Sequence, residues 1–250
     1  MSLLKETAKL YKNKMNINVL PLKGKRPTIE WDKWQTEIQT ENDINNMDWN
    51  NATGLGGIQG INDWRCIDID GAEDYEIVEL ILKALELPEK YCWVVQSGSG
   101  EGFHIYIRSK QPTPSSPAKR GIIDIIGGLK AVYKFKMKQE GYCKHIELRW
   151  MNCQTALPYS MHESGGVYSF YFDDPKEPPD YVELEKVIEC LEKYCVVDAS
   201  TTLSMTRKKS EKRENIKTEK IYFDKAKLES ALEYLSENLP DGSYEEWYKI

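Results

Sequence analysis

Apolar and polar residues alternate along three short stretches of the chain, which is the pattern of strands with one face in a core. These stretches are residues 64–70, 103–108 and 145–150. We predict three strands that each present polar groups on one face and apolar groups on the other. The polar groups are Asp68 and Asp70 on the first strand, His104, Tyr106 and Arg108 on the second, and His145, Glu147 and Arg149 on the third.

Other segments carry apolar residues at every third or fourth position, as helices do when one face packs against a core. The clearest is residues 72–87, with Ile77 and Ile81 on one face and Pro88 at its end. Helices are predicted over 3–15, 41–49, 72–87 and 181–194, and further short strands over 18–22, 91–96 and 167–172.

Two glycine-rich segments resemble nucleotide-binding loops, but neither has the required context. Residues 53–60 lead to a strand, whereas a dinucleotide fingerprint leads into a helix whose N-terminus holds the pyrophosphate. We therefore expect these glycines to shape a strand and a turn. Residues 97–102 lack the lysine and the following helix of a P-loop. A loop of this composition still lets backbone amides approach a phosphate closely.

The composition changes near residue 198. Of the 250 residues, 40% are apolar and 30% charged, as in an ordinary globular protein. After Asp198 the chain is rich in Ser, Thr, Lys, Arg and Glu and loses its periodicity, until Leu228, Leu232 and Leu235 return at helical spacing. We expect a catalytic domain over 1–198, a flexible charged linker over 199–220, and the start of a truncated helical domain over 221–250.

The net charge and the spacing of the cysteines argue against several classes of function. A net charge of −6 argues against a protein that coats nucleic acid non-specifically. The lysines between residues 130 and 144 alternate with aromatic residues, which fits either a groove for single-stranded nucleic acid or a solvated hairpin face. The six cysteines form no Cys-x-x-Cys pair, so neither a zinc ribbon nor a disulfide framework is indicated. No apolar run approaches the roughly 20 residues of a membrane helix, and we expect a cytoplasmic protein.

The paired aspartates on one strand suggest a site for divalent cations. Asp68 and Asp70 lie on the same face, and Mg²⁺ usually takes one or two protein carboxylates and leaves other positions to water and phosphates. If the two residues stood alone, an edge strand with two solvated aspartates would be the better explanation. If the polar faces of the three strands meet, Glu147 adds a third carboxylate, and two metal ions with nearby cations suit phosphoryl or nucleotidyl transfer.

Several motifs, in order along the chain, carry a family resemblance. Together they resemble the bifunctional primase-polymerase (Prim-Pol) domain of the archaeo-eukaryotic primase superfamily, over residues 5–172. The motifs are Val19-Leu20-Pro21-Leu22 with Lys25-Arg26-Pro27 and Trp31, the Ile67–Asp70 strand, the segment from Ser97 to His104, and Ile146-Glu147-Leu148-Arg149 followed by Leu157-Pro158-Tyr159-Ser160 and the residues up to Tyr168.

The resemblance implies an α+β archaeo-eukaryotic primase fold of two α/β modules, one like an RNA-recognition motif, with the active site in the cleft between them. It implies a DNA primase and DNA polymerase that uses two Mg²⁺ or Mn²⁺ ions held by Asp68, Asp70 and Glu147, with His104 on the phosphates of the incoming nucleotide. The implied partners are dNTP or NTP, single-stranded template and primer-template DNA. A helicase region in a longer plasmid or phage replication protein is a further expectation.

The resemblance also implies helpers around the nucleotide phosphates, namely Ser97, Ser99, Lys25, Arg149 and His162. Asp124 is a rival to Glu147 as the third acid. The chain departs from the family pattern in Tyr159, in a glutamate as third acid and in Gly102-Phe103 before His104. Two other functions use the same residues: a metal-dependent phosphodiesterase or nuclease, and a non-catalytic module that binds single-stranded DNA.

Overall fold

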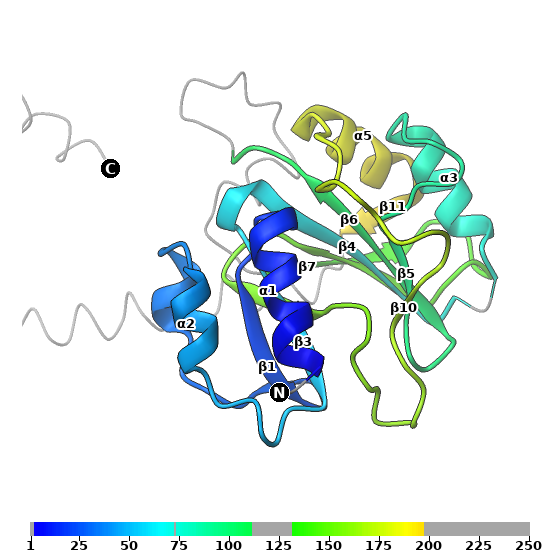
Figure 1. Ribbon diagram of the computed structural model, residues 1–250. Helices are drawn as coiled ribbons and strands as arrows, with labels where there is room; N and C mark the ends of the chain where they lie inside the picture. Colours follow the sequence, from blue (N-terminus) through cyan, green and yellow to red (C-terminus); the bar gives the residue numbers. More distant parts are fainter. Residues whose placement is uncertain (1–2, 73, 112–131, 198–250) are drawn as a thin grey trace, which may run out of the picture. The chain divides into compact units, whose positions relative to one another are not determined.

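The computed structural model describes residues 3–72, 74–111 and 132–197 (Figure 1). Asp124, the predicted linker over 199–220 and the segment 221–250 lie outside the described residues. Within the described part, the predicted strands and helices are confirmed, with bounds that differ by a few residues. The fold is a mixed α+β structure with two sheets whose strands pair in antiparallel fashion.

The larger sheet has seven strands, and its centre is the strand that carries Asp68 and Asp70. This strand lies between those that carry His104 and Glu147, so the three alternating stretches of the sequence are direct neighbours. In spatial order the strands are β10 (Ser169–Phe170), β5 (Val94–Gln96), β6 (Gly102–Arg108), β4 (Trp64–Asp70), β8 (His145–Arg149), β7 (Val132–Met137) and β11 (Cys195–Val197).

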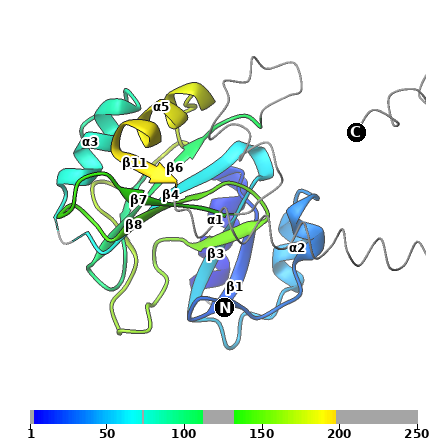
Figure 2. The same ribbon diagram turned by 180° about the vertical axis from the view of Figure 1, so that it is seen from behind.

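Helices α3 (Glu76–Ala84) and α5 (Leu184–Tyr194) lie side by side on one face of this sheet, as Figures 1 and 2 show from opposite sides. They bury aliphatic side chains such as Ile77, Ile81 and Leu191, together with the strand residues on that face. Both helices are shorter than predicted. The opposite face of the central strands carries the polar side chains.

The smaller sheet has four strands, in the order β2 (Arg26–Pro27), β1 (Val19–Lys23), β3 (Gly54–Gln59) and β9 (Cys153–Ala156). Its β3 strand is the glycine-rich segment that was predicted to be a strand rather than a dinucleotide loop. A Cβ atom at Gly54 would lie 2.6 Å from the Cβ atom of Ser160 and 3.1 Å from its Cα atom, so the close approach of the chain at this strand needs glycine.

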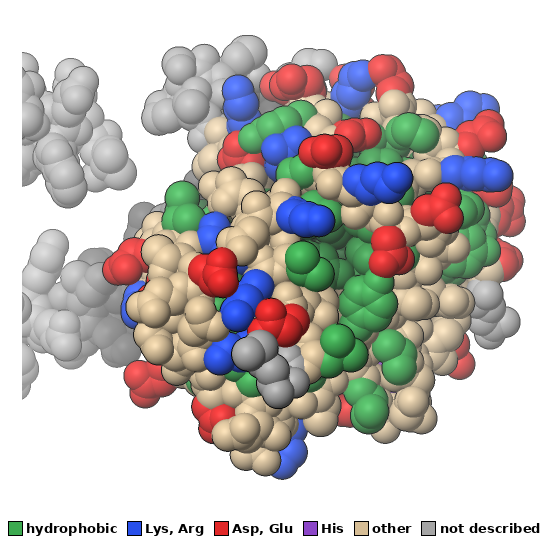
Figure 3. Space-filling model, in the orientation of Figure 1, with side chains coloured by type: hydrophobic (Ala, Val, Ile, Leu, Met, Phe, Trp, Pro, Cys, Tyr) green, Lys and Arg blue, Asp and Glu red, His purple; other side chains and the backbone are tan. Residues whose placement is uncertain are grey.

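Helix α1 (Leu3–Met15) packs against β1 and β3 of the smaller sheet and lies over them in Figure 1, and α2 (Glu41–Asn46) packs against α1. Short 3₁₀ helices span Asp32–Gln35 and Ile61–Asp63. Figure 3 shows acidic and basic side chains interspersed over this face of the molecule. None of the helices in the described part of the chain is both long and apolar enough to cross a membrane.

Tyr106 connects the two sheets. Its hydroxyl on β6 donates to the carbonyl oxygen of Ala156 on β9 at 2.8 Å and lies 3.0 Å from the Thr155 Oγ1 atom. Both faces of β6 are therefore buried, and His104 is 6% exposed. Since a buried hydroxyl needs a partner, this contact fixes β9 beside the polar face of the larger sheet.

Candidate active site

The register of the three central strands places Asp68, His104 and Glu147 in one row. Asp68 on β4 pairs with His104 on β6 and, on its other side, with Glu147 on β8. Directly opposite residues of antiparallel strands bring their Cβ atoms to about 4.5–5.5 Å. Pairing of segments that are distant in the sequence thus brings these predicted site residues together.

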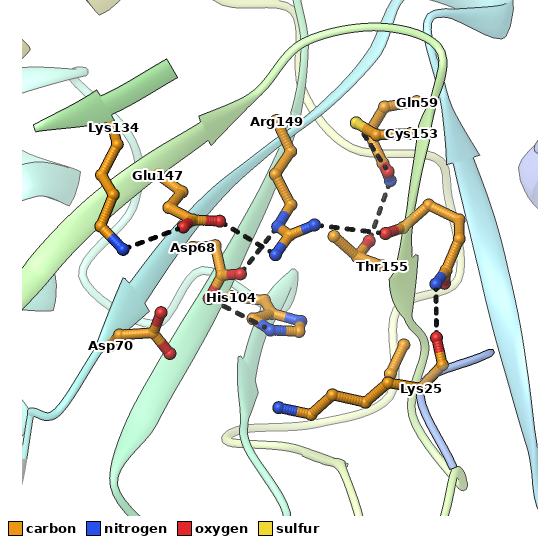
Figure 4. Close-up of polar contacts among 12 residues, drawn as sticks. Lys25, Gln59, Asp68, Asp70, His104, Lys134, Glu147, Arg149, Cys153 and Thr155 are labelled. Carbon is orange, nitrogen blue, oxygen red and sulfur yellow. Dashed lines mark hydrogen bonds and ion pairs between the residues drawn. The ribbon is translucent and has the colours of Figure 1, made fainter. Parts of the chain in front are cut away.

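Asp68 is buried, and a guanidinium and an imidazole contact its two carboxylate oxygens (Figure 4). The Arg149 Nε–H donates to Oδ2 at 2.8 Å, and the His104 Nε2 atom lies 3.4 Å from Oδ1. Burial by itself would raise the pKa of this carboxyl, but the charges and hydrogen bonds of His104 and Arg149 outweigh it and hold the pKa well below its usual range. Asp68 therefore keeps its charge in the folded chain.

Arg149 joins Asp68 to Glu147. Its Nη2 atom donates to the Glu147 Oε2 atom at 3.0 Å, and Lys134 on β7 donates to Oε1 at 3.4 Å. Burial acts to lower the pKa of Arg149, yet the two carboxylates overcome this effect and raise it above its usual value. The planar guanidinium is suited to bridging two acids in this way.

Asp70 lies at the end of β4 and has a half-exposed carboxylate. The His145 Nε2 atom is 2.8 Å from its Oδ2 atom and 3.6 Å from the Oε1 atom of Glu147. One ligand atom from each of these three residues lies within 4.8 Å of the others. Two carboxylates and an imidazole at such distances are a donor set that can hold a divalent cation.

Sequence reasoning did not include His145 among the metal ligands. The alternation of residues 145–150 places it on the polar face with Glu147, which is the one signal that the sequence contains. Its neighbour across the sheet is Asp70, and the sequence pattern does not reveal that pairing. Asp68, in contrast, is paired with Arg149 and His104 and is not part of the three-residue group.

A cavity of about 220 Å³ lies over this row and is lined by both sheets. The smaller sheet contributes Gln154, Thr155 and Ala156 of β9, and Lys25 follows β1 and extends toward His104 in Figure 4. Every predicted site residue except Glu147 lines this cavity, and Glu147 contacts it through Arg149. The lining residues from the prediction are Asp68, Asp70, His104, Ser97, Ser99, Lys25, Arg149 and His162.

Two loops at the cavity interlock through glycines. A Cβ atom at Gly166 would lie 2.1 Å from the carbonyl oxygen of Gly98, so the two backbones touch where neither has a side chain. The Ser164 hydroxyl donates to that same carbonyl at 3.1 Å and lies 2.9 Å from the His162 Nδ1 atom. The contact holds His162 beside the serines of the 97–102 loop.

A larger cavity of about 420 Å³ lies beside α1. It is mainly apolar, with Leu3, Leu10 and Tyr159 in its walls, and it shares no residue with the predicted site. The predicted acids and cations for a metal and a polyphosphate therefore gather at the smaller cavity.

Carboxylates for a divalent cation and cationic groups for a polyphosphate, gathered at one cavity on an α+β fold, are typical of enzymes that catalyse metal-dependent phosphoryl or nucleotidyl transfer. A comparison with family models supports this class: the N-terminal domain of bifunctional DNA primase/polymerases, Prim-Pol, matches residues 8–181. The chain belongs to the Prim-Pol family, and the resemblance predicted from its motifs is confirmed. No curated protein matches the chain.

Membership in the family has direct consequences. Prim-Pol enzymes are metal-dependent nucleotidyltransferases of DNA replication, and their substrates are DNA and nucleotides. The carboxylates and the imidazole at Asp70, His145 and Glu147 fit such a metal requirement. The primase-polymerase class expected from the sequence thus has both a family match and a suitable donor set.

Proposed function

We propose that this chain synthesises DNA on a template, both extending primers and starting new ones from nucleoside triphosphates, in the replication of a plasmid, a phage or a similar element. The observation that carries the proposal is the convergence of Asp70 and Arg149 from two neighbouring strands at one cavity, with Glu147 joined to Arg149 beside it. Family membership supplies the reaction class, and the cavity supplies a place for the reacting groups.

In this proposal the acids Asp68, Asp70 and Glu147 hold two Mg²⁺ or Mn²⁺ ions. Their oxygens are the ligands that such hard cations prefer, and Asp70 is half-exposed and so accessible from the cavity. The two ions, when bound, stabilise the attacking and leaving oxygens of an in-line displacement. Glu147 is preferred to Asp124 as the third acid because it is the direct partner of Asp68 in the sheet.

The cationic side chains bind the triphosphate of the incoming nucleotide. Arg149 and His104 both line the cavity and are paired with Asp68 when no nucleotide is present. A polyphosphate competes with that carboxylate for them, since guanidinium matches phosphate as well as carboxylate geometry. This exchange releases Asp68 to serve as a ligand. Lys25 and His162 approach the same space from other walls of the cavity.

The two sheets correspond, in this proposal, to the two α/β modules of the primase fold, one of them like an RNA-recognition motif. The cavity lined by both sheets supports a cleft between them. The serines at 97 and 99 lie at the loop next to His104, where their hydroxyls are 2.7 Å apart. They are placed to contact the phosphates together with the backbone amides of that loop.

The test is incorporation of labelled dNTP on primed and on unprimed single-stranded template, with Mg²⁺ and with Mn²⁺. We expect both reactions with the unaltered chain, and a loss of at least about a hundredfold in Glu147→Gln because charge stabilisation at the reacting phosphate is removed. The matched control is Glu89→Gln, an exposed glutamate outside the cavity, which should retain full activity.

Two results would contradict the proposal. If the chain shortens DNA without any nucleoside triphosphate, it is a metal-dependent nuclease that uses the same acids. If it binds single-stranded DNA but incorporates no nucleotide with either metal, it is a template-binding module. Incorporation that survives Glu147→Gln would remove the assignment of the third acid.

A further inference from the structure

We propose that His145 is a direct ligand of the catalytic divalent cation, together with Asp70 and Glu147, and that its imidazole makes the site prefer Mn²⁺ to Mg²⁺. The inference deepens the proposed function, because it names the ion and a residue that selects it. It adds a nitrogen ligand to a site that sequence reasoning built from carboxylates alone.

The sheet register holds the three residues in place. His145 on β8 is the direct partner of Asp70 on β4, and Glu147 lies two residues further along β8 on the same face. Two of the three ligand positions thus come from one strand and the third from its neighbour, so backbone hydrogen bonds keep them together. Among the described residues, they form the one group of His, Cys, Asp or Glu side chains close enough to share an ion.

The Nε2 atom of His145 is buried and has no hydrogen-bond partner in the described structure, although Asp70 Oδ2 is 2.8 Å away. Proximity without hydrogen-bond geometry means that the ring N–H does not point at that oxygen. A buried nitrogen normally has a partner. A cation between the imidazole and the two carboxylates supplies one, and the nitrogen then binds it through its lone pair.

The other two histidines of the chain are used differently. The His104 Nε2 atom faces Asp68, whose second oxygen Arg149 occupies, and His104 Nδ1 lies 3.4 Å from the Tyr106 hydroxyl. His162 Nδ1 lies 2.9 Å from the Ser164 hydroxyl. Since the sequence has three histidines, His145 is the one placed beside two carboxylates.

The ligand chemistry determines the preferred ion. Mg²⁺ binds oxygen almost exclusively and keeps several waters, whereas imidazole nitrogen favours transition-metal ions. Two carboxylates still suit Mn²⁺, so a set of two carboxylates and one imidazole shifts the balance from Mg²⁺ to Mn²⁺. An aspartate in place of the histidine would return the site to an all-oxygen set.

The direct test is pulsed electron paramagnetic resonance of the untagged chain with one equivalent of Mn²⁺, in the absence of nucleotide and DNA. A coordinated imidazole gives ¹⁴N modulation of the Mn²⁺ signal, which we expect in the unaltered chain and in His104→Ala and His162→Ala. His145→Ala should lose it. Modulation that persists in His145→Ala, or that is absent from the unaltered chain, would overturn the assignment and leave an ion pair between His145 and Asp70.

Calorimetric titration with Mn²⁺ and with Mg²⁺ gives a second readout. Loss of a group that only orients a ligand costs about 10–100-fold in affinity, so loss of His145 itself should raise the Kd for Mn²⁺ at least about tenfold. His145→Asp should lower the preference for Mn²⁺ over Mg²⁺ by a similar factor. Thermal unfolding without metal checks that both variants fold, and equal Kd ratios in folded His145→Asp and unaltered protein would refute the selectivity.

These measurements involve no polymerisation, so they are separate from the test of the proposed function. A ¹⁴N signal lost in His145→Ala supports the ligand assignment even if no nucleotide is incorporated, a result that would overturn the polymerase proposal alone. Incorporation of nucleotide without any ¹⁴N signal would support the polymerase proposal and overturn the assignment of His145 as a ligand.

Discussion

Asp68 and Asp70 lie two residues apart on the same face of β4, yet their surroundings differ in nearly every respect. The side chain of Asp68 is 9% exposed and is contacted by Arg149 and His104. That of Asp70 is 49% exposed and is contacted by His145. Asp68 is enclosed by a guanidinium and an imidazole, whereas Asp70 is half-exposed at the wall of the cavity.

The difference shows how one strand supplies two kinds of acid. Burying a carboxylate is costly unless cations and hydrogen bonds compensate for the lost hydration. Asp68 therefore depends on its contacts with Arg149 and His104 even when no ligand is bound. A half-exposed carboxylate has a small solvation cost and can exchange its partner for a metal ion. We infer that Asp68 contributes mainly to stability in the free chain and Asp70 mainly to metal binding.

The largest expected effect is that of Asp70→Asn on catalysis. Loss of a metal-binding charge should lower nucleotide incorporation about a thousandfold, equivalent to about 4 kcal/mol of transition-state stabilisation. The free energy of unfolding without metal should change by no more than about 0.5 kcal/mol, because the side chain is half-exposed. Primer extension and urea unfolding measure the two quantities. A large loss of stability in this variant would remove the distinction between the two aspartates.

Asp68→Asn should lower the free energy of unfolding of the metal-free chain far more than Asp70→Asn does. Removing the charge of Asp68 leaves Arg149 with Glu147 as its remaining carboxylate partner, so the free energy of unfolding should fall by about 3 kcal/mol. Urea unfolding at neutral pH measures this loss, with Asp70→Asn as the control. If the two variants unfold at the same urea concentration, Asp68 is not held more strongly than Asp70.

The smallest effect is expected in the pH dependence of stability. The pKa of Asp68 is depressed in the folded chain, so its contribution is complete above the ordinary carboxyl pKa of about 4 and is lost as the pH falls from there toward the depressed value. Between pH 5 and 2 the unaltered chain should lose roughly 2 kcal/mol more than Asp68→Asn.

Urea unfolding at several pH values across this range measures the difference. Asp70→Asn serves as the control and should follow the unaltered chain. Parallel curves for Asp68→Asn and the unaltered chain would mean that its cationic neighbours do not stabilise the carboxylate of Asp68.

Much of the fold could be predicted because its signals are local. Alternation identified the strands around Asp68, His104 and Glu147, and the order of motifs identified the family that residues 8–181 match. The type of the helix over 72–87 was predicted correctly but its extent was not: α3 covers Glu76–Ala84, and it buries Val78 and Leu82 in addition to the predicted Ile77 and Ile81. Helix ends and the buried face depend on the sheet beneath, which local periodicity does not describe.

The sequence by itself determined which side chains share a face within each strand, because that depends on a repeat of two residues along one segment. Only the tertiary structure decided that Asp70 is opposite His145, that Arg149 joins Asp68 to Glu147, and that β9 covers the row. These contacts depend on the register between strands that are far apart in the chain. A shift of one residue in that register would move every side chain of the strand to the opposite face of the sheet, although the alternation along the sequence would be unchanged.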